Sequence, residues 1–177
     1  MTTQEFNTNL EKLTGKLEKE DSNYARIIRA VQIFYWIFIP VFAGITILEY
    51  RETHSLNTIV SGLFLMVAFL VIALTFRKYY KEYKYVDYSL PTLEMLKKAA
   101  YRYQPFQKRG LWVLLGLAFM DVGLTIDWLD QNTSVVHTQI FFGASLLVGF
   151  VIGLVLWYIR YKPIRDNALR LIKEIEE

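Results

Sequence analysis

The fold is decided by GLAFMDVGLTIDWLD, residues 116–130. The stretch is mostly apolar, yet Asp121 lies in its middle, between Met120 and Val122. With the residues before it, the stretch forms an apolar block at 111–129, and about 20 such residues are enough to cross the hydrocarbon core of a bilayer. The sequence therefore predicts a membrane helix that carries an acid.

Three further blocks of this kind lie along the chain, at 27–50, 59–76 and 139–159. Hydrophobic residues make up 54% of the chain. Arg29 and Glu49 lie near the ends of the first block, Asp121 and Asp127 lie in the third, and the second and fourth blocks carry no charge. A soluble amphipathic helix keeps a polar face instead. The pattern predicts an all-α polytopic membrane protein with four transmembrane helices.

The positive charges indicate the orientation. Nineteen of the twenty Lys and Arg residues fall in 1–29, 77–110 and 160–177, which a four-span model places on one side of the membrane. Because cytoplasmic segments carry the excess of Lys and Arg, we expect both termini in the cytoplasm. The expected location is the cell (inner) membrane.

The N-terminal segment is amphipathic. Phe6, Leu10, Leu13 and Leu17 recur at helical spacing and line one face. That face either lies on the membrane or packs against another cytoplasmic helix. The expected segments are a cytoplasmic amphipathic helix (1–25), a first transmembrane hairpin (26–76), a cytoplasmic helical connection (77–110), a second transmembrane hairpin (111–161) and a cytoplasmic C-terminal helix (162–177).

The connection should contain a break followed by a second helix. Pro91 disfavours helix at the residue before it and suits a first helical turn. A helix over about 91–103 would place Leu93, Leu96, Ala100 and Tyr103 along one stripe. The tyrosines before the break fit either an interfacial belt or stacking between cytoplasmic helices.

The two hairpins resemble each other. The first span of one ends in Thr46-Ile47-Leu48-Glu49, and that of the other in Thr125-Ile126-Asp127. Each second span leads into a helix that begins at a proline. A tandem two-helix repeat would explain this likeness, although the topology alone imposes part of it.

Asp121 is the sharpest candidate site. Ten residues of helix from Leu111 place its carboxyl about 15 Å deep, near the midplane of a core about 30 Å thick. An ionised aspartate there costs at least about 2.5–3.5 kcal/mol. It could hydrogen-bond Thr125, or the Trp36 carbonyl that Pro40 leaves without its helical partner. Alternatively it handles protons or cations, together with Asp127 six residues further along the helix.

The fourth span carries a small residue at every fourth position: Ser145, Gly149 and Gly153. Such a ridge lets another helix approach closely, and Pro40 in the first span is a further packing candidate. The partner is either within the chain or in a second copy. We expect a homo-oligomer assembled through this ridge; a pore would require oligomerisation as well, since four helices have few ways to enclose an aqueous path alone.

The cytoplasmic face is basic and rich in tyrosine. We expect it to bind anionic lipid headgroups or a cytoplasmic protein partner. Nucleic acid is not favoured, because no phosphate-binding loop accompanies the charge. The candidate residues are Arg77, Lys78, Tyr79, Tyr83, Lys84, Lys97, Lys98, Arg102, Lys108 and Arg109.

Several function classes lack support in the sequence. The chain has no cysteine, which excludes disulfides and Cys-ligated metals. No catalytic or nucleotide-binding motif is present, and His54 and His137 lack metal-ligand spacing. We therefore expect no enzyme activity, no cofactor and no metal. The expectation is a self-associating membrane scaffold or regulator; the alternative is an oligomeric ion or proton channel or small transporter that uses Asp121.

Overall fold

The computed structural model describes residues 3–131 and 133–176, without the side chains of Thr3, Phe6, Arg109 and Asp130. The described residues are almost entirely helical and contain no strand. Four helices are long and apolar enough to cross a membrane, as the sequence predicted. The elements are α1 (Thr3–Thr53), α2 (Leu56–Lys84), α3 (Thr92–Arg102), η1 (Lys108–Gly110), α4 (Leu111–Asp130), α5 (Val135–Leu156), η2 (Trp157–Tyr161) and α6 (Lys162–Glu176).

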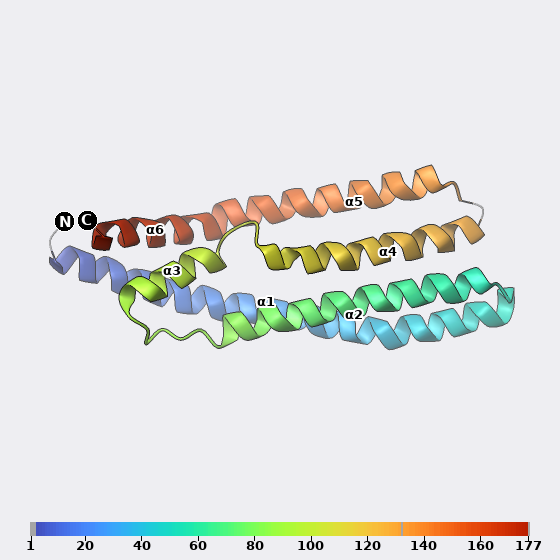
Figure 1. Ribbon diagram of the computed structural model, residues 1–177, viewed down its shortest axis with the longest axis horizontal. Coiled ribbons are helices and arrows are strands. Elements are labelled where there is room, and N and C mark those ends of the chain that lie inside the picture. The colour runs from blue at the N-terminus through green and yellow to red at the C-terminus, as the bar shows by residue number, and fades with distance from the viewer. Residues whose placement is uncertain (1–2, 132, 177) are drawn as a thin grey trace.

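Helix α2 is central to the apolar half of the molecule, because it packs against both α1 and α4 (Figure 1). Glycines allow these close approaches. A Cβ on Gly116 would lie 2.5 Å from Ile72 Cγ1, and one on Gly123 would lie 2.9 Å from Leu65 Cγ. At Gly62 of α2 a Cβ would collide with Thr46 of α1. The three helices therefore form one tightly packed unit.

Helix α5 packs much more loosely. Among its residues only Thr138 is buried, and a Cβ on Gly143, Gly149 or Gly153 would meet no atom within 4 Å. Figure 1 shows α4 between α5 and α2. The second hairpin is thus more open than the first, and the tandem repeat stays a prediction.

Helix α1 runs without interruption from Thr3 to Thr53, through Pro40 and through the segment boundary expected at residue 25. The amphipathic segment and the first apolar block are therefore one helix. Leu13 and Leu17 are buried in a core shared with α3 and α6. The apolar face of this segment thus packs against other helices; the Phe6 side chain lies outside the described residues.

At one end of the molecule, distant parts of the sequence form a small bundle, which we call the helical cap. It consists of residues 10–28 of α1, the last turns of α2, and α3 and α6. Figure 1 shows α3, α6 and the start of α1 gathered at this end. Its largest fully buried apolar side chains are those of Leu17, Leu96, Ile164 and Leu171.

The connections into the cap follow local sequence signals. Helix α2 stops at Lys84, and α3 begins directly after Pro91, as the proline predicted. Of the expected stripe, Leu96, Ala100 and Tyr103 are buried, and Leu93 is partly buried against the same core. Between α5 and α6 the chain passes through one π-helical turn, η2, so these helices form a nearly continuous rod.

Candidate functional site

The carboxyl of Asp121 is held by an amide from the neighbouring helix. Gln139 Nε2 donates to Asp121 Oδ1 at 2.9 Å and to Thr125 Oγ1 at 3.0 Å. Asp121 and Thr125 lie one turn apart on α4, whereas Gln139 lies one turn into α5. The three side chains therefore form a polar clasp between two helices that otherwise contact each other sparsely.

The clasp differs from the expected arrangement. The hydrogen-bond partner of Asp121 is Gln139, rather than the Trp36 carbonyl or Thr125 alone. Gln139 is the first residue of the fourth apolar block, where an amide is common at the edge of a span and does not stand out as a contact. Asp127 lies apart, near the end of α4, where it accepts from Gln131 Nε2 at 3.1 Å.

The small-residue ridge makes no close helix contact at its glycines, although Gly153 lines the aromatic pocket described below. Ser145 Oγ donates to the Phe141 carbonyl of its own helix at 2.8 Å. Gly149 and Gly153 have open space where a Cβ would be. Pro40, the other packing candidate, is exposed on α1.

A buried acid in the cap, Asp21, has three hydrogen-bond partners and is not among the residues predicted from the sequence. Its carboxylate is 2% exposed. Oδ2 accepts from Arg102 Nη2 at 2.8 Å and from the Tyr88 hydroxyl at 2.5 Å, and Oδ1 accepts from the Tyr103 hydroxyl at 2.6 Å. We call Asp21 with these three partners the Asp21 hub. It joins α1, the loop before α3 and the end of α3.

A further hydrogen bond secures the hub to α2. The Tyr83 hydroxyl donates to the Arg102 carbonyl at 2.8 Å. Burial is the main cause that raises the pKa of Tyr103, and the negative charge of Asp21 adds to it. Burial and the hydrogen bond to Asp21 likewise raise the pKa of Tyr88. Both phenols therefore keep their protons and act as donors over the physiological pH range.

One signal in the sequence could have revealed the hub. Leu13, Leu17, Asp21 and Ala25 follow one another at intervals of four, so Asp21 lies on the apolar stripe of α1. An acid on a buried face requires a partner. The partner itself could not be inferred, because Arg102 lies 81 residues away along the chain.

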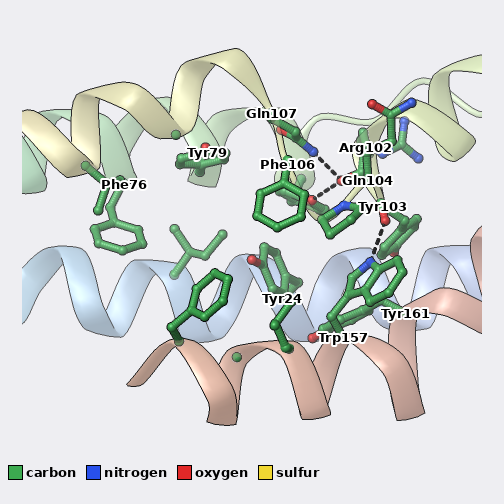
Figure 2. Close-up of a pocket in the computed structure, with 18 residues that line it drawn as sticks. Tyr24, Phe76, Tyr79, Arg102, Tyr103, Gln104, Phe106, Gln107, Trp157 and Tyr161 are labelled. Atoms are coloured by element: carbon green, nitrogen blue, oxygen red, sulfur yellow. Dashed lines mark hydrogen bonds between the residues drawn. The ribbon is translucent and has the colours of Figure 1, made fainter. Parts of the chain in front are cut away.

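Below the cap, an aromatic pocket of about 380 Å³ lies between α1, α2, the junction of α5 with η2, and the segment after α3. Figure 2 shows Tyr24, Phe106, Trp157 and Tyr161 around it. Trp157 Nε1 donates to the Tyr103 carbonyl at 2.9 Å, as drawn there. The lining is mainly aromatic and aliphatic, and it contains no carboxylate or histidine from the described residues.

The expected basic face does not form a single surface. Arg102 is buried in the hub and Tyr83 is buried in the cap core, whereas Tyr79 is partly buried and lines the aromatic pocket. On α3, Lys97 pairs with Glu176 at 2.7 Å and Lys98 pairs with Glu94 at 2.9 Å. The exposed candidates outside these ion pairs are Arg77, Lys78, Lys84 and Lys108, and the Arg109 side chain lies outside the described residues.

No cluster of three or more metal-ligating side chains occurs within residues 3–131 and 133–176. Comparison of the chain with family models, curated proteins and solved structures gave no match. The function must therefore be argued from the residues of this chain alone.

Replacing Asp21 with alanine should loosen the cap while leaving the apolar helices packed. The change leaves the Arg102 guanidinium buried without its counter-ion, and breaking such a pair costs about 3–5 kcal/mol. Hydrogen exchange at the amides of α3, measured on the full chain, should show a free energy of local opening that is lower by this amount.

The neighbouring acid provides the control. Glu20 pairs with Arg160 at 2.7 Å, but the Arg160 side chain is 42% exposed. Glu20→Ala should therefore change the exchange of α3 by no more than about 1 kcal/mol. Equal exchange in the two variants would refute the central role of Asp21.

Proposed function

We propose that the protein is a non-enzymatic, self-associating membrane scaffold or regulator. The four apolar helices would cross the cell membrane, and the basic helical cap would face the cytoplasm. The observation that carries the proposal is the unpartnered face of α5, an apolar helix in which only Thr138 is buried.

The use of glycine elsewhere in the chain supports self-association. Gly62, Gly116 and Gly123 each lie where a Cβ would collide with a neighbouring helix. Gly149 and Gly153 have the same helix-interior position but no neighbour. Glycine costs up to about 1 kcal/mol in a helix relative to alanine, and a close contact with a second copy would offset that cost.

The cap supports the scaffold part of the proposal. Four segments share its core, and the Asp21 hub with Tyr83 joins three of them, α1, α2 and α3. Such a platform holds its exposed side chains in a constant arrangement beside the membrane. A cytoplasmic protein and anionic lipid headgroups are the partners that its charge favours.

Self-association can be tested with leucine at the ridge. The double variant Gly149→Leu, Gly153→Leu should lower energy transfer between labelled copies in liposomes at least severalfold, because the side chains would hold a partner helix away. Gly44→Leu is the matched control, since Gly44 of α1 also faces open space. Energy transfer that is unchanged in the ridge variant, or lowered equally in Gly44→Leu, would contradict the proposed interface.

The second candidate function is an oligomeric channel or small transporter. Asp121 favours it, because acids inside membrane helices commonly mark ion or proton paths. The clasp to Gln139 and Thr125 favours a structural role instead. An asparagine at this position can still accept a hydrogen bond from Gln139.

Flux in proteoliposomes separates the two functions. We expect neither the wild type nor Asp121→Asn to carry protons or cations above empty liposomes, and both to assemble alike. Flux in the wild type that disappears in Asp121→Asn at equal protein density would replace the scaffold proposal with the channel.

A further inference from the structure

A second hollow lies on the opposite side of α2 from the cap core. It is a groove of about 400 Å³ between α2 and the start of α4. Its lining side chains are those of Val71, Leu74, Thr75, Arg77, Lys78, Lys81 and Trp112. Apolar residues line one end of this groove, and cations line the other.

The lining of the groove changes from apolar to cationic along helix α2. Val71, Leu74, Lys78 and Lys81 recur at spacings of three, four and three, so they lie along one face of α2. Within this face the residue type changes between Leu74 and Lys78, over a single turn. An occupant would therefore have one apolar end and one anionic end.

Trp112 marks the level of the change. It lies in the first turn of α4, and the residue is 55% exposed. The Lys78 ammonium lies 6.0 Å from the centre of this ring. Tryptophan prefers the level of the lipid headgroups, and a lysine on a long stem extends its charge to the same level.

The cations of the groove are available to an external anion. No ion pair among the described residues involves Arg77, Lys78 or Lys81, whereas cations of α3, η2 and α6 pair with carboxylates of the cap. Thr75 is internally satisfied, because its hydroxyl donates to the Val71 carbonyl at 2.8 Å. The side chains that line the groove thus include three cations and no carboxylate.

We propose that this groove is a binding site for one anionic phospholipid. Its phosphate contacts Arg77, Lys78 and Lys81 beside Trp112, and the first part of an acyl chain lies along Val71 and Leu74. Charge complementarity selects an anionic headgroup, and the apolar end selects a lipid over a free phosphate. The site rests on the membrane placement in the proposed function, but it does not depend on self-association.

The test compares two triple variants of the full chain that lose the same charge. Arg77→Gln, Lys78→Gln, Lys81→Gln removes the cations of the groove. The control, Lys12→Gln, Lys16→Gln, Lys19→Gln, removes exposed cations of α1 that lie outside the groove. Native mass spectrometry then measures retention of phosphatidylglycerol and of phosphatidylcholine with identical acyl chains.

We expect the wild type and the control to retain one phosphatidylglycerol in preference to phosphatidylcholine. The groove variant should retain it at least about tenfold more weakly, because each lost cation near an anionic surface removes a favourable interaction. Equal retention by both triple variants would overturn the site, as would equal retention of the two lipids. Displacement of the bound lipid by water-soluble glycerol phosphate would also overturn the lipid site, because the cations would then recognise the anion without an acyl chain.

The variants from the two experiments separate the lipid site from the proposed self-association. The groove variant should keep the energy transfer between copies, and Gly149→Leu, Gly153→Leu should keep the bound phosphatidylglycerol. Protein that does not insert into liposomes at all would instead refute the membrane placement, and with it both proposals.

Discussion

The cap depends on the pairing of the buried Asp21 carboxylate with its hydrogen-bond donors. A charge at 2% exposure is costly unless it is fully paired, and Arg102, Tyr88 and Tyr103 supply its partners. These residues come from one loop and one helix end that are otherwise far from α1 in sequence. The hub therefore determines how the segment between α2 and α4 lies against the N-terminal helix.

The position of the cap in turn affects the apolar helices. Tyr103 bonds Asp21 through its hydroxyl, and its carbonyl accepts from Trp157 at the end of α5. The ring of Tyr103 also stacks on Tyr161, with centroids 5.6 Å apart. One residue thus links the hub to the junction of α5 and α6. The loosely packed α5 is held mainly at its two ends, by these contacts and by the clasp to Asp121.

Local patterns in the sequence were enough for much of the fold. Four long apolar blocks predicted four helices able to span a membrane, and Pro91 predicted the start of α3. The continuity of α1 was missed, because an amphipathic stripe followed by an apolar block does not show whether a break separates them. The polar contacts were harder to predict than the helices. Asp21 lies in a run of charged residues, and its partners are more than 60 residues away in the sequence.

The candidate site could be predicted only in part. Asp121 was found because an acid in an apolar block is costly, yet its partner Gln139 lies on the next helix. Arg102 was grouped with surface cations because nothing local distinguishes it from Lys97 or Lys98. The number of charged residues can be counted from the sequence. Which of them are buried depends on which helices pack together, and the sequence does not show that.

The four apolar helices should cross a membrane with the cap on one side, and cysteine labelling can show this placement. The chain has no cysteine of its own, so single substitutions report without background. With a membrane-impermeant maleimide on intact cells, His54→Cys and His137→Cys should react, whereas Ser22→Cys and Asn167→Cys should react only after lysis. Reaction of all four positions, or of His54→Cys and Ser22→Cys from the same side, would contradict the four-span topology.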